Sequence, residues 1–205
     1  MLTVKTKKYF ASLSGLQREK ILNSALLEIV KTKKIKSILD IGSGSRIWSH
    51  LFPGCTYKTF DLDPNENPDI VGDFKSFEFK EHYDLIIATE FLEHFNDPEL
   101  FYSKVNTLLN SNGYLLISTP FFFKIHSNPN DYFRFTLNGH QVYSDRNFDL
   151  IKFYEHGGYF QVMWEIFTSP KYLFFLRIFN RLFRIKKKST EYPLGYVLLF
   201  GKKNG

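Results

Sequence analysis

The sequence predicts a doubly wound α/β fold, in which helices pack on both faces of a mostly parallel sheet. Strand-like apolar runs alternate with helical patterns along most of the chain. The run 83–88 is apolar enough to be buried on both faces, as central parallel strands are. With 205 residues, and with neither a repeat nor a linker, residues 1–205 have the length of a single domain.

The first half of the chain contains the predicted cofactor-side elements of such a sheet. Between Arg18 and Thr32, apolar residues recur at helical spacing, so this helix should cover one face. A second helix is expected to begin at about residue 47, after two glycines. The run Asp97-Pro98-Glu99 starts a third helix with a capping acid, an early proline and an acid near the dipole's positive end, and Asn112-Gly113 should stop it. The predicted strands are 37–41, 57–60, 69–71 and 83–88.

The second half begins with a predicted strand at 114–119, followed by a long loop at 120–136. This loop is rich in aromatic residues, and loops of such length in compact domains are usually functional. Glycines at 157 and 158 should stop a helix over 149–156. The remaining predicted elements are a strand at 159–167, an amphipathic helix at 171–188 and a last strand at 194–201.

The turn Gly42-Ser43-Gly44 is a candidate binding site. Glycine permits a positive φ and lets a ligand approach the backbone, and a helix start adds unpaired N–H groups that suit an anion. Asp61 follows Asp40 by 21 residues and ends the second predicted strand, where an acid can accept hydrogen bonds from ribose hydroxyls. The pattern implies an adenosine-containing ligand, with an ordinary strand-to-helix turn as the alternative.

Charge and cysteine content bear on partners and location. The net charge is +6 and the basic residues cluster in the final third, which fits a nucleic acid, an anionic membrane or an acidic substrate equally well. The single Cys55 excludes an internal disulfide framework and fits a reducing compartment. No apolar run precedes Leu13 and no window is long and apolar enough to span a bilayer. We therefore expect a cytoplasmic protein without a signal peptide.

With the later segments included, the chain resembles the class I S-adenosylmethionine-dependent methyltransferases from about Lys36 to Thr136, and more loosely to the C-terminus. Five segments in this order carry the resemblance: Leu39-Asp40-Ile41-Gly42-Ser43-Gly44, Phe60-Asp61-Leu62-Asp63, Gly72-Asp73-Phe74, 89–94 and 112–120. The resemblance implies a Rossmann-like sheet of seven strands with the last one antiparallel. It also implies a cofactor-binding half at 18–120, and a substrate side at 120–205 that contains the loop, the amphipathic helix and the final strands.

Within this family, the segment 126–136 is similar to that of small bacterial members of the methyltransferase type 11 group. Such proteins are often linked with surface-glycan or secondary-metabolite chemistry. This link is associational and does not define the substrate.

The resemblance implies which residues bind S-adenosylmethionine. The glycine turn would lie against the methionine moiety, Asp61 would hold the ribose, and Asp73 would contact the adenine amino group. The full set implied is Asp40, Gly42, Gly44, Arg46, Asp61, Leu62, Asp73, Phe74 and Glu90. Arg46 is a departure, because many relatives have a glycine there. Either the turn is rearranged, or Arg46 meets the carboxylate of the methionine moiety.

The loop 120–136 carries the predicted acceptor-side residues. His126 and Asp131 form the candidate catalytic acid/base pair, and Tyr132 and Arg134 are the candidate substrate residues, because ligands of open α/β sheets bind beyond the carboxyl ends of the strands. The alternative is structural, with Asp131 capping a turn and Arg134 pairing with it to fix the loop. His94 is predicted to have a supporting or structural role.

No metal ion is predicted. The run Glu90-Phe91-Leu92-Glu93-His94 resembles the inverted zinc-protease motif, but Glu90 stands where a histidine ligand belongs. The sulfonium of the cofactor supplies the driving force, so the protein mainly positions the acceptor, with a base helping where the acceptor is a hydroxyl or a carboxyl.

The function expected from these residues is S-adenosylmethionine-dependent methyl transfer to a small molecule or a glycan precursor, at oxygen. A nucleic-acid methyltransferase, or a binding protein that keeps the fold without turnover, is the alternative. Nucleic-acid enzymes of this fold that modify amino groups often carry an Asn/Asp-Pro-Pro-aromatic run after the fourth strand. This chain has Glu90-Phe91-Leu92-Glu93 at that place, which argues against nucleic acid as the substrate.

The segment 171–188 raises the question of a membrane contact. On a helix its polar side chains fall in one narrow arc, formed by Arg177, Asn180, Arg181, Arg184 and Lys188. One interpretation is a helix that covers the sheet or forms a homodimer face. The other is an interfacial helix that holds the enzyme peripherally at the inner face of an anionic membrane, where a lipid-linked glycan acceptor would be found.

Overall fold

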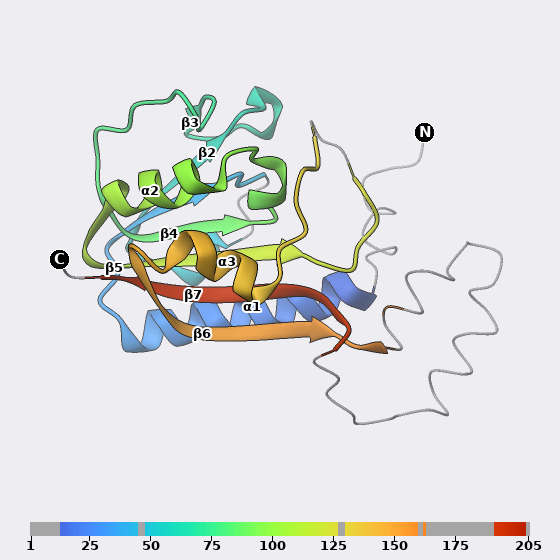
Figure 1. Cartoon of the computed structure of the whole chain (residues 1–205). Helices are drawn as coiled ribbons and strands as arrows, with labels where there is room; N and C mark the ends of the chain where they lie inside the picture. The colour runs from blue at the N-terminus through green and yellow to red at the C-terminus, as the bar shows by residue number, and fades with distance from the viewer. Residues whose placement is uncertain (1–12, 45–47, 127–129, 160–161, 163–190, 204–205) are drawn as a thin grey trace, which may run out of the picture.

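The computed structural model describes residues 13–44, 48–126, 130–159, 162 and 191–203 (Figure 1). One sheet of seven strands has the order β3-β2-β1-β4-β5-β7-β6. Strand β7 is antiparallel to β5 and β6, and the other paired strands are parallel. The strands are β1 (Ser37–Ile41), β2 (Thr56–Asp61), β3 (Ile70–Val71), β4 (Tyr83–Thr89), β5 (Leu109–Pro120), β6 (Phe148–Gly157) and β7 (Pro193–Lys202). The mostly parallel, seven-stranded sheet that the sequence predicts is confirmed.

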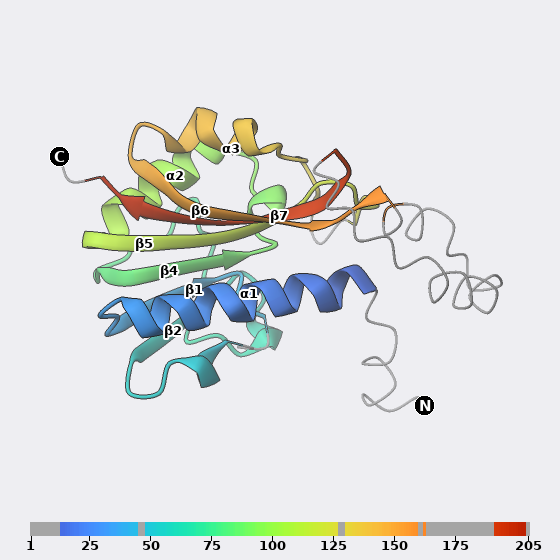
Figure 2. The same cartoon turned by 90° about the horizontal axis from the view of Figure 1, so that it is seen from below.

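Helices cover both faces of the sheet, with α1 on one face and α2 and α3 on the other (Figure 2). Strand side chains alternate between the two layers, so that Ile38 packs in the core under α1 while Leu39 and Ile41 pack in the core under α2. The helices are α1 (Leu13–Thr32), α2 (Pro98–Leu108) and α3 (Leu137–Ser144), and single 3₁₀ turns are η2 (Ser49–Leu51), η3 (Pro64–Glu66) and η4 (Leu92–His94).

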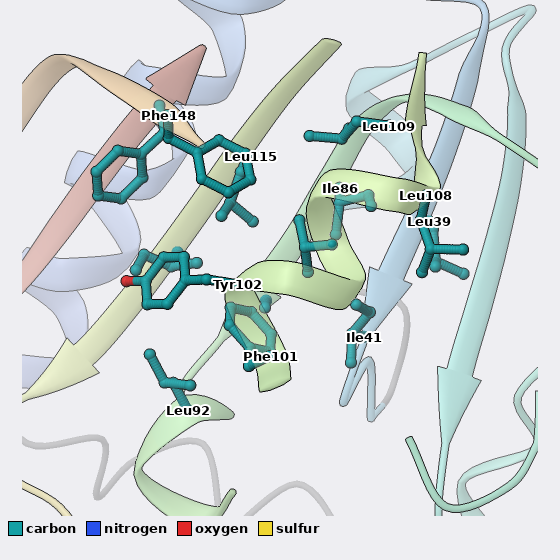
Figure 3. Packing of buried hydrophobic residues seen from close by; sticks show 14 of the residues in the cluster. Leu39, Ile41, Ile86, Leu92, Phe101, Tyr102, Leu108, Leu109, Leu115 and Phe148 are labelled. Atoms are coloured by element: carbon teal, nitrogen blue, oxygen red, sulfur yellow. The ribbon is translucent and has the colours of Figure 1, made fainter. Parts of the chain in front are cut away.

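The core under α2 combines aromatic and aliphatic side chains (Figure 3). The ring of Tyr102 lies 6.1 Å from that of Phe148, and its hydroxyl is 3.0 Å from Nδ1 of the buried His140. The other nitrogen of His140 lies 2.9 Å from Oγ1 of Thr119. Burial lowers the pKa of His140 to about 3, so the imidazole is neutral and can serve as both donor and acceptor. This neutral network fastens α3 to α2 and β5.

The helix predicted over 149–156 is wrong, because this segment belongs to strand β6. Asp149 and the following glycines resemble helix start and stop signals, but β6 pairs along its length with β7. Ile151 and Phe153 remain 48% and 45% exposed, as is usual for residues on an edge strand with one open face. The strand predicted at 159–167 is also wrong where it is described, since Tyr159 and Val162 are helical and the rest lies outside the described residues.

Three other observations on the helices differ from the prediction. Helix α2 ends at Leu108, and Asn112-Gly113 lies within β5, where Asn112 has a φ of +62°. Between the glycine turn and β2, where a helix was expected, the described residues form only the short turn η2. Helix α3 was not predicted, although the side chain of Thr136 caps it by accepting the N–H of Gly139 at 3.0 Å.

The segment 171–188, to which the predicted amphipathic helix was assigned, lies outside the described residues. None of the helices in the described part of the chain is sufficiently long and apolar to cross a membrane.

Candidate functional site

The predicted cofactor residues follow the carboxyl ends of four neighbouring strands. Gly42 follows β1, Asp61 ends β2, Asp73 comes shortly after β3, and Glu90 comes directly after β4. The chain reverses its direction of strand addition between β1 and β4, and such a switch point is where open α/β sheets bind their ligands. The loop after β5 extends beyond the arrowheads of β4 and β5 at the same edge (Figure 1).

The glycine turn is held by β2. The N–H of Gly42 donates to the carbonyl of Phe60 at 2.8 Å, and the N–H of Gly44 donates to Oδ2 of Asp61 at 3.1 Å. The other carboxylate oxygen of Asp61 accepts the N–H of Asp63 at 3.0 Å. Each oxygen of an ionised carboxylate has two lone pairs, so Asp61 keeps acceptor capacity for two ribose hydroxyls. The arrangement therefore fits the adenosine part of S-adenosylmethionine.

Asp40 lies beneath this turn and is 1% exposed. Its Oδ2 accepts the hydroxyl of Tyr57 at 2.5 Å, while its Oδ1 is buried and has no hydrogen-bond partner among the described residues. Burial raises the pKa of Asp40 to about 7, the Tyr57 hydrogen bond opposes this rise, and the charge of Asp61 adds to it. Asp40 thus ties β1 to Tyr57 of β2 two residues before the turn begins, and its contact with a cofactor stays a prediction.

Glu90 adopts a strained conformation that directs the chain away from β4. Its φ is +52°, which is uncommon for a residue with a side chain. One carboxylate oxygen pairs with Arg18 of α1 at 2.5 Å, and the other accepts the hydroxyl of Ser118 in β5 at 2.9 Å. The sequence did not predict a role for Arg18, because the two partners are 72 residues apart.

The remaining predicted cofactor residues differ in accessibility. Leu62 is 57% exposed beside Asp61, as an apolar residue that contacts an adenine ring would be. Asp73 is exposed and accepts the N–H of Lys75 at 2.9 Å. Phe74 is 2% exposed within the aromatic core, which leaves only its backbone for a cofactor contact. Arg46 lies outside the described residues.

On the acceptor side, the structure brings His126, Asp131 and Arg134 together. Asp131 is paired with the Arg134 guanidinium through both of its oxygens, and it accepts the N–H of His126 at 3.0 Å. The Arg134 hydrogen bonds hold the pKa of Asp131 well below its usual range, so this carboxylate is a poor base. The pairing is the one that the structural alternative anticipated. His126 keeps a side chain that is 33% exposed, and Tyr132, which follows Asp131 in the chain, is 48% exposed.

Glu93 is a feature of this site that the sequence did not single out. It lies in η4 and is 0% exposed, yet neither carboxylate oxygen has a hydrogen-bond partner in the described part of the chain. Burial, and then the charge of Glu90, raise the pKa of Glu93 to about 9. The imidazoles of His94 and His126 lie next to it, with nitrogens 3.8 and 4.0 Å from Oε1. Nothing in the sequence pattern connects residues 93 and 126, because the loop after β5 brings them together.

A hollow of about 610 Å³ lies elsewhere, between α2 and α3. Asp97, Leu100 and Tyr143 are among the residues that line it. It contains none of the residues at the carboxyl edge of the sheet, so we do not assign it to the cofactor.

Replacing Gly42 by alanine should weaken both folding and cofactor binding. A Cβ at this position would lie 2.8 Å from Cδ2 of Phe91, and the φ of +65° is unfavourable for any side chain, at roughly 1–2 kcal/mol. Gly54 has a φ of +84° with nothing within 4 Å of an added Cβ, so Gly54→Ala is a matched control for backbone strain alone. We expect a larger fall in melting temperature for Gly42→Ala than for Gly54→Ala, and equal falls would show that the contact with Phe91 does not matter.

Comparisons with known structures support the fold. The N-methyltransferase NodS from Bradyrhizobium japonicum has a TM-score of 0.61 at 12% identity, with 97% of this chain and 91% of that chain covered, and it was solved with S-adenosyl-L-homocysteine. The O-methyltransferase of a trans-AT PKS multienzyme from Brevibacillus brevis, also solved with S-adenosyl-L-homocysteine, has a TM-score of 0.61 at 12% identity over 90% of this chain and 73% of that chain. An S-adenosylmethionine-dependent methyltransferase from Clostridium acetobutylicum has a TM-score of 0.62 at 10% identity, with 95% of this chain and 94% of that chain covered.

At such low identities, these likenesses show a common fold. No curated protein matches the sequence. The model of a family described as a methyltransferase domain matches residues 15–156, which is more than half of the chain. The chain therefore belongs to the methyltransferase-domain family, within the class I enzymes whose cofactor is S-adenosylmethionine.

Proposed function

We propose that this methyltransferase acts on an oxygen atom of a small molecule or a glycan precursor. The observation that supports the proposal is the placement of His126 beside Asp131, in the loop after β5. The imidazole Nδ1 lies 3.3 Å from Oδ2 of Asp131, which orients the ring and leaves Nε2 free of hydrogen bonds within the described residues. A hydroxyl acceptor needs a group that can take its proton, and an oriented imidazole is the commonest such group in enzymes.

The residues of the chain would divide the work as follows. S-adenosylmethionine supplies a methyl group on a positively charged sulfur, so that the bond to the acceptor forms as the bond to sulfur breaks. Asp61 would hold the ribose, the glycine turn would hold the methionine moiety, and Nε2 of His126 would take the acceptor proton. Asp131 is a positioning residue, since its oxygens are engaged by Arg134 and its low pKa makes it a weak base. The exposed ring of Tyr132 would contact the acceptor.

Replacing His126 by alanine should reduce methyl transfer by about 100-fold or more, the usual contribution of a general base, while leaving the affinity for S-adenosylhomocysteine unchanged. Asp131→Asn should give a smaller loss, because the imidazole would remain but would be less well oriented. The measurement is transfer of labelled methyl to a panel of sugars, phenols and hydroxy acids, with DNA and RNA as competing acceptors. His82→Ala, at an exposed histidine, is the control.

Three results would contradict the proposal. Full rates in His126→Ala would leave the loop with a positioning role only. Transfer to DNA or RNA in preference to the small acceptors would favour the nucleic-acid alternative. Binding of S-adenosylhomocysteine without transfer to any acceptor would favour a protein that keeps the fold without turnover.

Contact with a membrane and formation of a homodimer also remain proposals. Both rest on the sequence of residues 171–188, where aromatic and basic side chains would separate on a helix. A location at an anionic membrane would suit a lipid-linked glycan acceptor.

A further inference from the structure

We propose that Glu93, His94 and His126 bind a divalent transition-metal ion. One ligand atom from each residue lies within 4.8 Å of the other two, and the residues come from η4 and from the loop after β5. Nε2 of His94 is 3.8 Å from Oε1 of Glu93, and Nε2 of His126 is 4.0 Å from the same oxygen. Two atoms bound to one ion at about 2.1 Å lie roughly 3–4 Å apart, so the three side chains need little adjustment.

The burial of Glu93 is the independent observation that calls for a cation. A carboxyl group with no exposed surface and no hydrogen-bond partner is costly to bury in either protonation state, and a buried carboxylate is normally paired or bound to a metal, so an ion here would take the place of the carboxyl proton. Among the described residues, the arginines that could neutralise Glu93 already pair with other carboxylates. Arg18 pairs with Glu90, and Arg134 pairs with Asp131. An ion between the carboxylate and the two imidazoles would satisfy Glu93.

The outer nitrogens of both histidines are arranged as in metal sites. Nδ1 of His94 contacts the carbonyl oxygen of Asn130, and Nδ1 of His126 lies 3.3 Å from the carbonyl oxygen of Lys124 and 3.3 Å from Oδ2 of Asp131. A histidine ligand usually donates its second N–H to a carbonyl or a carboxylate, which leaves the other nitrogen unprotonated and directed at the ion. Here this places the proton on Nδ1 and leaves Nε2 free on both rings.

The donor set indicates the class of ion. Two imidazole nitrogens and one carboxylate oxygen suit Zn²⁺, Co²⁺, Fe²⁺ or Mn²⁺, whereas Mg²⁺ and Ca²⁺ prefer oxygen ligands throughout. The inverted zinc-protease motif did not fit the sequence, because Glu90 stands where that motif has a histidine ligand. In the structure, Arg18 and Ser118 occupy the Glu90 carboxylate, and His126 from a distant loop supplies the missing imidazole.

Three protein ligands leave a coordination position open for the acceptor, as in catalytic zinc sites. This part of the inference rests on the oxygen acceptor of the proposed function, and it assigns Nε2 of His126 to the ion in place of its role as the base. With the ion bound, Nε2 of His126 would be a ligand and could not take the acceptor proton. The acceptor hydroxyl oxygen would bind the ion, which makes the hydroxyl more acidic, and its proton would pass to solvent. The oxygen would then attack the methyl carbon as the bond from that carbon to sulfur breaks.

The test is titration of the full chain, freed of metal by a chelator and dialysed, with Co²⁺. Visible absorption reports coordination by nitrogen and oxygen, and calorimetry gives the stoichiometry. We expect one Co²⁺ per chain, and a loss of affinity of at least about tenfold in Glu93→Gln and in His126→Ala, since even changes to outer partners of metal ligands cost that much. His82→Ala should bind as the wild type does. His126 is partly exposed, so its alanine variant should fold even where Glu93→Gln does not.

The proposed metal site is disproved if the folded wild type gives no visible absorption band when Co²⁺ is added. It is also disproved if His82→Ala loses as much affinity for Co²⁺ as His126→Ala does. Calorimetry with S-adenosylhomocysteine reports separately on the cofactor site, so the two sites can fail independently. Once an acceptor is found, loss of transfer in a chelator and recovery with Zn²⁺ or Co²⁺ would support the ion's role with the acceptor. A full rate in the chelator would contradict that role and favour His126 as the base.

Discussion

Replacing Asp61 by alanine should raise the dissociation constant for S-adenosylmethionine by roughly 5- to 150-fold, which corresponds to about 1–3 kcal/mol for hydrogen bonds to a charged group. The carboxylate is the only predicted ribose acceptor at the end of β2, and its oxygens also hold the N–H groups of Gly44 and Asp63 at 3.1 and 3.0 Å. The variant would therefore lose the predicted ligand bonds and also loosen the turn that is predicted to face the methionine moiety. Isothermal calorimetry with S-adenosylmethionine and S-adenosylhomocysteine measures the change.

A matched control distinguishes a local effect from a change in net charge. Asp149 is an exposed acid at the start of β6, so Asp149→Ala removes the same charge away from the site. We expect its affinity to be that of the wild type. Melting curves of both variants show whether the weaker binding of Asp61→Ala reflects unfolding. Unchanged affinity in a folded Asp61→Ala would remove Asp61 from the cofactor site.

The parallel part of the sheet was predictable because its signals are local. Each of the first five strands is an apolar run bounded by turn residues, which is the sequence pattern typical of buried parallel strands. Strand β6 was not predictable, because its sequence carries helix-like start and stop signals and its ladder partner, β7, lies beyond the segment 163–190. Pairing with a distant strand here outweighs the local signals.

The same distinction holds for the site. Gly42, Gly44 and Asp61 were recognisable because spacing along the chain fixes their places at neighbouring strand ends. Contacts that join distant segments were missed. The Arg18–Glu90 pair spans 72 residues. The cluster of Glu93, His94 and His126 forms because the backbone N–H of Tyr132 donates to the carbonyl of Glu93 at 2.8 Å, which ties the loop after β5 to η4.

Asp40, in β1 just before the glycine turn, should make the stability of the fold depend on pH. Its carboxyl group is buried, and its pKa is raised to about 7. In the unfolded chain the carboxyl group titrates near its ordinary pKa of 3.8. The native state thus binds the proton more tightly, so the free energy of unfolding should fall as the pH rises from about 4 to about 7, and then become level.

Asp40→Asn removes this titration while keeping an oxygen for the hydroxyl of Tyr57. The free energy of unfolding of the variant should exceed that of the wild type by an amount that grows by about 1.4 kcal/mol per pH unit between pH 4 and pH 7. Above pH 7 the difference should level off at about 4 kcal/mol. Urea unfolding of both proteins between pH 4.5 and pH 8 measures it. The expected order of stability at pH 8 is Asp40→Asn above the wild type.

Asp84, at the other end of the sheet, provides a control of opposite sign. Burial acts to raise its pKa, but hydrogen bonds from the Asn110 side chain and from the N–H groups of Lys36 and Ser37 outweigh burial and lower it. Its contribution to stability is present above the unfolded pKa and is lost as the pH falls through the folded pKa. Asp84→Asn should therefore be less stable than the wild type at pH 8, with a gap that narrows toward low pH. If Asp40→Asn showed the same trend as Asp84→Asn, Asp40 would be ionised in the folded protein, and a donor other than Tyr57 would have to stabilise its charge beneath the turn.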